Sequence, residues 1–401
     1  MKKYFFPKTL IQKMLFTLII MAIYLIGREL PIYGVNLDAY ESLRGSADDL
    51  IMQTIGGDRY KTSILALGIS PYMFSTLFIQ MAVALKNADS KSHTSPKKIT
   101  RGTLILMLIW AIIQAYFTTR VTFYLYGEGL QLMLSKLISI VQMVTGAFVI
   151  LWLATRNGKY GIGGQTILIY VNILDSVVNT VRDTALRDLK VIGIISIAAV
   201  LVTIIFENTE YRIPMQRISI HNIYSDKNYI PIKLNPIGMM PVMFSSAFFM
   251  LPVYISTTLN SLLPDNNFFE YLHDNMNMEE PLGIGVYIVV LYVITIVFSF
   301  VFISPKNLAE SLQKSGDSIT GLRAGKNTKS YISKRVLIIS IFSATFMGLF
   351  LGMPLVLQLN GMVPKAVMSL PSIMIALASI NCNLYRELRA VKDYDGYVPF
   401  I

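Results

Sequence analysis

Charged residues are scarce in this chain of 401 residues, at 15% of the total, whereas soluble globular proteins carry about 25%. Hydrophobic residues make up 54%, and the mean hydropathy is +0.55. The apolar residues gather in long blocks without a single charge, at 63–85, 102–119, 281–305 and 336–363. A helix needs about 20 apolar residues to cross the hydrocarbon core of a bilayer. These blocks exclude a soluble enzyme and a disordered chain.

Cysteine and histidine are also scarce. The one cysteine, Cys382, has no partner for a disulfide within the chain, which excludes a disulfide scaffold. No nucleophile, metal-ligand set or nucleotide-binding fingerprint appears in the sequence, so we expect no catalysis, no metal and no cofactor. Asp175 and Lys136 are the main ionisable residues inside the apolar spans. Coupled transporters and pumps place more such groups near the membrane midplane, so the scarcity argues against both classes.

The apolar pattern predicts an all-α polytopic membrane protein with ten transmembrane helices. The expected spans are residues 11–27, 63–85, 102–119, 132–155, 161–180, 191–206, 236–257, 283–303, 336–358 and 366–384. No cleavage site follows the first span, so we expect it to be retained. An even number of spans puts both termini on one side. With that side cytoplasmic, 25 of the 35 Lys and Arg fall in inside segments and 9 outside, as the positive-inside rule requires.

Two expected cytoplasmic loops, residues 207–235 and 304–335, are long and basic. Within the first, two short apolar stretches at 211–213 and 230–233 flank a polar centre and predict a two-stranded hairpin. The loops are either ordinary solvated loops or a docking surface for a soluble partner. On the other side, segment 28–62 is too polar to span, and we interpret it either as an outer loop helix or as a re-entrant element held within the membrane body.

Proline and glycine interrupt two of the expected spans. The stretch 68–71 (GISP) breaks the second span, and Pro236 and Pro241 fall in the first turns of the seventh. Broken helices often line a pathway, although an incidental kink is as good an interpretation of either one alone. A third glycine-rich stretch, residues 161–164, predicts a tight cytoplasmic turn between the fourth and fifth spans. Four polar side chains on the expected spans are either weak contacts of a gate or packing contacts: Gln80, Gln114, Ser245 and Ser246.

Seven short stretches in this order resemble one family, SecY, the channel subunit of the bacterial protein translocase. They are residues 64–72 (ILALGISPY), 159–164 (KYGIGG), 211–216 (YRIPMQ), 230–235 (IPIKLN), 238–246 (GMMPVMFSS), 307–312 (NLAESL) and 321–328 (GLRAGKNT). The resemblance implies a SecY-like fold, with two pseudo-symmetric halves at residues 1–190 (spans one to five) and 191–401 (spans six to ten). The halves would clasp an hourglass pore.

The sequence departs from the usual family pattern, and in these departures it resembles the accessory SecY branch of Gram-positive bacteria. The hairpin tip at 217–229 is trimmed, and Ser70 and Met73 replace the usual Met and Ile. This resemblance implies export of preproteins, above all glycosylated serine-rich surface adhesins, driven by an accessory SecA-type motor ATPase. A divergent housekeeping SecY is the alternative. A secondary transporter or flippase is a further alternative from another class, which the uncharged spans disfavour.

The resemblance also assigns roles to residues. It implies a pore ring of Ile69, Met73, Thr166, Tyr170, Met243 and Met374. It implies a plug at about residues 37–62, including Leu50, Ile51, Ile55, Gly56 and Gly57. It implies a lateral gate between the second and seventh spans, with Gln80, Gln114, Ser245 and Ser246 as its polar contacts. It implies motor docking at Arg323, Lys326, Arg212 and Lys233.

Thr166 and Tyr170 depart from a purely apolar ring. A more polar ring would suit a hydrophilic, sugar-bearing substrate. The expected partners are the motor, small membrane subunits similar to SecE and SecG, the preprotein and the lipid bilayer. We expect no nucleic acid partner. The expected location is the cytoplasmic membrane, with both termini cytoplasmic.

Overall fold

The fold is described by a computed structural model over most of the chain. The described residues are 8–36, 63–89, 95–125, 129–183, 186–216, 228–238, 240–262, 266–322, 325–364 and 367–396. The segment expected to be the plug, residues 37–62, lies outside them. The chain forms two compact units, and α3 (Ser70–Asp89) and α13 (Leu370–Gly396) each contribute residues to both.

Among the described residues, the first unit contains four complete helices together with α3 as far as Ile79 and α13 from Ile380. The four are α1 (Lys8–Arg28), α4 (Pro96–Val121), α5 (Leu130–Tyr160) and α6 (Thr166–Asp183). Met107, Ala111 and Ala115 lie at helical spacing on α4 and pack against Met143 and Ala147 of α5. Small residues at these positions let helices approach closely. The opposite faces of these helices expose large apolar side chains, as lipid-facing surfaces do.

A glycine turn joins α5 to α6 at residues 161–164, as the sequence predicts. Gly163 has a φ of 75°, a left-handed conformation that glycine adopts at little cost. The Asn157 side chain donates hydrogen bonds to the carbonyls of Ile162 (2.8 Å) and Gly164 (2.9 Å). The turn is therefore fixed from within by one buried amide.

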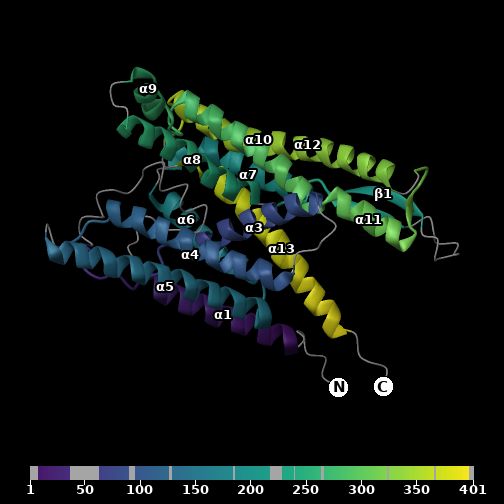
Figure 1. The fold of residues 1–401 in the computed structure, drawn as a ribbon, viewed down its shortest axis with the longest axis horizontal. Coiled ribbons are helices and arrows are strands. Elements are labelled where there is room, and N and C mark those ends of the chain that lie inside the picture. Colours follow the sequence, from purple (N-terminus) through teal and green to yellow (C-terminus); the bar gives the residue numbers. More distant parts are fainter. Residues whose placement is uncertain are drawn as a thin grey trace. The chain divides into compact units, whose positions relative to one another are not determined.

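The second unit contains the remaining helices and the strands, with α3 from Gln80 and α13 through Ser379. Its helices are α7 (Leu186–Asn208), α8 (Met240–Leu262), α9 (Asn267–Asn275), α10 (Pro281–Ile303), α11 (Pro305–Ser315) and α12 (Lys326–Leu359). Long helices α10 and α12 lie side by side (Figure 1). Gly348 and Gly352, one turn apart on α12, face Tyr292 and Ile288 of α10 with almost no room for a side chain. This spacing of small residues is typical of close helix pairs in membranes.

A three-stranded antiparallel sheet lies at one end of the second unit, beside α11, and α9 lies at the opposite end of α10 (Figure 1). Strands β1 (Glu210–Gln216) and β2 (Tyr229–Lys233) pair as the predicted hairpin, with Arg212 opposite Pro231. Strand β3 (Ser318–Ile319) pairs with the other edge of β1. The buried face of the sheet packs on α11 and α12 through Ile213, Ile232, Leu312, Ile332 and Val336. Residues of the two basic loops, 207–235 and 304–335, therefore share one sheet and one buried cluster.

Six helical segments of the described residues are long and apolar enough to cross a membrane. They are Leu10–Arg28, Pro96–Thr119, Leu130–Tyr160, Lys190–Asn208, Pro281–Ser315 and Lys326–Leu359, and they coincide with six of the ten expected spans. The other four spans correspond to α3, α6, α8 and α13. Polar residues interrupt α3, α6 and α13, for example Gln80, Asp175 and Asn381.

The second expected span needs a correction at its start. Residues 64–69 form turns, and the helix begins only at Ser70. Gly68 has a φ of 59°, which is incompatible with a right-handed helix, and Pro71 fits only the first turn of a helix because it lacks an N–H. Similarly, α8 begins at Met240, so Pro236 precedes the helix and only Pro241 lies in its first turn. These prolines and glycines mark helix starts, and the proline inside α8 is Pro252.

Candidate functional site

The solvent-facing side of the sheet is basic and aromatic. Side chains alternate along β1, so Ile213 and Met215 are buried while Arg212, Pro214 and Gln216 are exposed. The Arg212 guanidinium lies 4.5 Å from the centre of the Tyr229 ring. Arg335 of α12 lies 5.5 Å from the ring centre of Tyr211 and 5.1 Å from that of Tyr331. These cation–π contacts hold two cations in place while leaving donors available to a partner.

Three of the four predicted docking residues lie within the described residues, all in the second unit. Arg212 is on β1 and Lys233 ends β2. Lys326 is the exposed first residue of α12, next to Gly325 with a φ of 110°. Arg323 lies outside the described residues, so its position relative to the sheet stays a prediction.

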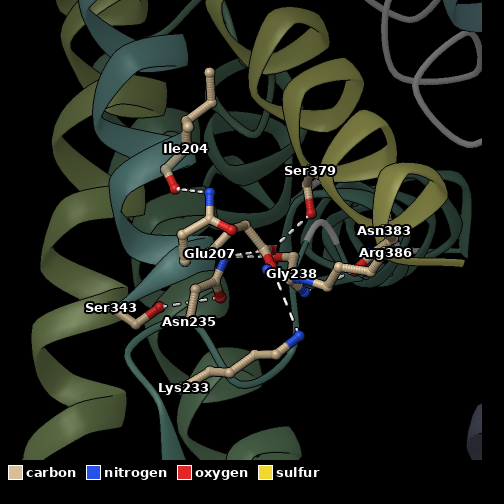
Figure 2. A network of polar contacts seen from close by, with 10 residues as sticks. Ile204, Glu207, Lys233, Asn235, Gly238, Ser343, Ser379, Asn383 and Arg386 are labelled. Carbon is tan, nitrogen blue, oxygen red and sulfur yellow. Dashed lines mark hydrogen bonds and ion pairs between the residues drawn. The ribbon is translucent and has the colours of Figure 1, made fainter. Parts of the chain in front are cut away.

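A buried acid next to the end of β2 is not among the residues predicted from the sequence. Glu207 is in the last turn of α7, and its side chain is 1% exposed. One of its oxygens accepts a hydrogen bond from the Ser379 hydroxyl at 2.8 Å, and the other lies 4.0 Å from Lys233 Nζ (Figure 2). The predicted sixth span ends at residue 206, which puts Glu207 in the loop that follows. The signal in the sequence is a lone acid directly after a run of residues without charge.

Asn235 extends the contacts of Glu207 to two further helices. Its side-chain nitrogen lies 3.5 Å from Glu207 Oε1 and donates to the carbonyl of Gly238 at 3.1 Å, just before α8. Its side-chain oxygen lies 3.4 Å from the hydroxyl of Ser343 on α12. We call Glu207, Lys233, Asn235, Ser343 and Ser379 the Glu207 cluster. It joins α7, β2, the start of α8, α12 and α13 within the second unit.

The predicted pore-ring residues are distributed over both units. In the first unit, Ile69 and Met73 are buried at the start of α3, where the Ile69 carbonyl accepts from the Met73 N–H at 3.1 Å. Thr166 and Tyr170, also in the first unit, are half-buried on α6. In the second unit, Met243 of α8 is buried, and Met374 of α13 packs beside Ile192, Val363, Val367 and Leu370. The ring itself stays a prediction.

The predicted gate residues make contacts inside their own units. The Ser70 hydroxyl lies 3.4 Å from Gln114 Oε1, which links the start of α3 to α4. The Ser245 hydroxyl lies 3.4 Å from that of Tyr287, which links α8 to α10. Gln80 is exposed on α3, and the side chain of Ser246 lies outside the described residues. A gate contact among these residues stays a prediction.

A second buried ionic group lies in the first unit. Arg28, 8% exposed at the end of α1, contacts Asp175 Oδ2 of α6 at 2.7 Å and donates to Asn172 at 3.1 Å. The Tyr24 hydroxyl donates to the same Asn172 oxygen at 2.8 Å. Asp175, noted in the sequence as an unusual charge within a span, is therefore the partner of an arginine that the sequence analysis placed in an outer loop.

The predicted plug residues Leu50, Ile51, Ile55, Gly56 and Gly57 all lie outside the described residues. The segments that flank them are described. The Asn36 N–H donates to the Phe123 carbonyl at 2.9 Å, and the Ile64 N–H donates to the Leu30 carbonyl at 2.9 Å. Both flanks of segment 37–62 are thus attached to the first unit.

Comparison with known proteins gives one consistent family. The family model described as SecY matches residues 63–382. The accessory Sec system protein translocase subunit SecY2 of Streptococcus agalactiae (serotype Ia) is 31% identical over 402 residues, covering 98% of this chain and 97% of the relative. The protein of the same name from Leuconostoc gelidum is 30% identical over 408 residues, covering 96% of each.

Solved structures show the same fold. A structure described as that of a protein conducting channel aligns with a TM-score of 0.68 at 16% identity, covering 100% of this chain and 98% of that one. Sec61 in a canine ribosome–channel complex aligns with a TM-score of 0.62 at 16% identity, over 100% and 98%. The family model spans most of the chain and the relatives align almost end to end: the chain belongs to the SecY family.

Proposed function

We propose that this chain is the protein-conducting channel of an accessory Sec translocase. The observation that carries the proposal is the alignment at 31% identity, over nearly the full length of both chains, with a relative of that name. The fold of the described residues agrees with it. The chain is a multi-pass membrane protein, and we propose the cell membrane as its location, with both termini cytoplasmic.

The basic sheet supports docking of a cytoplasmic motor. Residues from both predicted docking loops, 207–235 and 304–335, pair in one sheet of the second unit, which packs on α11 and α12. Such packing matters because a motor that pushes a polypeptide needs a fixed point. We propose that a SecA-type ATPase binds this surface and hydrolyses the ATP, while the channel performs no chemistry.

The side chains of the predicted ring support a pore. The predicted ring residues lie on α3, α6, α8 and α13 or directly before them. We propose that the halves 1–190 and 191–401 enclose this pore and that segment 37–62 closes it. Methionine at three ring positions suits a seal around many sequences, because its unbranched side chain adapts to the polypeptide that passes.

The similarity to accessory SecY2 proteins suggests which preproteins are exported and which subunits assemble with the channel. We propose that the exported preproteins are glycosylated serine-rich surface adhesins. We propose that small membrane subunits similar to SecE and SecG complete the translocase.

Arg323→Glu tests the docking step. We expect motor-driven export to fall by about tenfold or more, because reversing a charge at an interface costs several kcal/mol. Export of an adhesin is measured in cells whose only accessory channel is the variant, and membrane insertion is measured by immunoblot of the membrane fraction. Lys314→Glu, on α11 of the same loop, is the matched control and should export normally. Normal export from Arg323→Glu would contradict the docking assignment.

A further inference from the structure

Glu207 is a buried carboxylate for which the proposed function has not yet given a role. An ionised carboxylate withheld from water is costly unless charged or hydrogen-bonding groups surround it. The Glu207 cluster supplies such groups at unequal distances. The Ser379 hydroxyl is close, at 2.8 Å, whereas the Asn235 nitrogen at 3.5 Å and the Lys233 ammonium at 4.0 Å are distant.

The close and distant partners belong to different parts of the second unit. Ser379 is fully buried on α13, one of the helices assigned to the pore. Lys233 ends a strand of the docking sheet, and its side chain is 39% exposed. Within the Glu207 cluster, the shortest contact of Glu207 is therefore with Ser379 of α13 and the longest is with Lys233 of β2 (Figure 2).

Lys233 is shared between two partners. It is both a predicted docking residue and an ion partner of Glu207. The ammonium is 39% exposed and lies 4.0 Å from the carboxylate, so an acidic group of a docked motor can reach it, and the buried Glu207 then bears the cost of the lost ion pair. Glu207 then loses this ion pair, and the charge balance around its carboxylate changes. Asn235 lies next to this carboxylate and also donates to the Gly238 carbonyl before α8.

We propose that Glu207 is a positioning residue that couples occupancy of the docking sheet to the position of α8 and α13. This inference rests on the proposed function and adds a route from the motor to the pore helices. Coupling of this kind is reciprocal, so the state of the pore helices also affects how readily Lys233 is released. Asn235 and Ser343 serve as the link to the start of α8 and to α12.

Glu207→Gln tests the proposal because it keeps the shape and one acceptor oxygen while removing the charge. The readout is the number of ATP molecules hydrolysed by the motor per preprotein translocated into membrane vesicles that carry the full channel. We expect this ratio to rise by about tenfold, the size of effect expected for losing a charged hydrogen-bonded contact. The motor concentration for half-maximal ATP hydrolysis should stay unchanged or fall, because Lys233 is no longer held by Glu207.

The ratio separates coupling from folding. A variant that merely folds in lower yield loses translocation and channel-stimulated ATP hydrolysis together and leaves the ratio unchanged. Glu310→Gln, an exposed acid on α11, is the matched control and should behave as the native channel. Lys233→Gln should raise the ratio as Glu207→Gln does, and the double variant should be no worse than either single one.

A ratio for Glu207→Gln within twofold of the native value overturns the proposal. Ser379→Ala removes only the close hydrogen bond and carries the same test if Glu207→Gln yields no folded channel. Failure of the inference is distinct from failure of the proposed function. In the first case the native channel translocates with the motor and the variants keep its ratio. In the second the native channel itself translocates nothing.

Discussion

At the scale of single residues, Arg28 and Glu207 are two buried ionic residues with defined partners in the part of the chain that the structure describes. Arg28 is surrounded by Asp175, Asn172 and Tyr24 rather than lying in an outer loop. Sequence pattern identified Asp175 as unusual but could not identify its partner, because 147 residues separate the two in the chain. Glu207 was missed for a similar reason, since its contacts Asn235 and Ser379 lie 28 and 172 residues away in the chain.

Tyr170 tests whether a polar pore ring serves a sugar-bearing substrate. We expect Tyr170→Ile to lower translocation of a glycosylated preprotein by about two- to tenfold relative to the same preprotein without sugars, because one hydrogen-bonding group is lost from the pore. Both preproteins are compared in the same vesicles, together with the ion conductance of the resting channel. Tyr271→Ile, on the exposed helix α9, is the control. Equal translocation and unchanged conductance would argue against a polar ring.

At the scale of elements, local signals predicted what local residues decide. The hairpin of β1 and β2 was confirmed because alternating apolar residues and the polar centre are close in sequence. The turn at 161–164 was confirmed because glycines mark it. Strand β3 was not predicted, since two residues give no pattern and their partner on β1 lies about 100 residues earlier. The break at 68–71 was predicted from its glycine and proline, but the span was started at residue 63 because hydropathy does not mark where a helix begins.

The close packing of α10 on α12 gives a prediction at this scale. We expect Gly348→Leu to lower the free energy of unfolding by about 1–3 kcal/mol, because a Cβ at Gly348 would already lie 2.9 Å from the Tyr292 ring. Thermal unfolding of the purified protein in detergent measures the effect. Gly285→Leu is the matched control, since a Cβ at Gly285 meets nothing within 4 Å. Equal melting temperatures for the two variants would contradict the packing described for this pair.

At the scale of the whole molecule, composition and charge predicted the class, and the motifs predicted the family. Scarce charge and long apolar blocks indicated a membrane protein, and the family was confirmed by the model match over residues 63–382. The pore ring, gate, plug and docking assignments stay predictions. They depend on how helices far apart in the sequence pack together. They also depend on residues 37–62 and on Arg323, which lie outside the described residues.

The central claim is that this chain conducts polypeptides across a membrane when a motor drives it. The direct measurement is protease protection of a serine-rich preprotein added to inverted membrane vesicles that contain the chain, its companion subunits, the SecA-type ATPase from the same cell and ATP. We predict that protected preprotein accumulates only when channel, motor and ATP are all present, and that Arg323→Glu lowers it by about tenfold or more. Equal protection in vesicles that lack the chain, or none in complete vesicles with an active motor, would contradict the account.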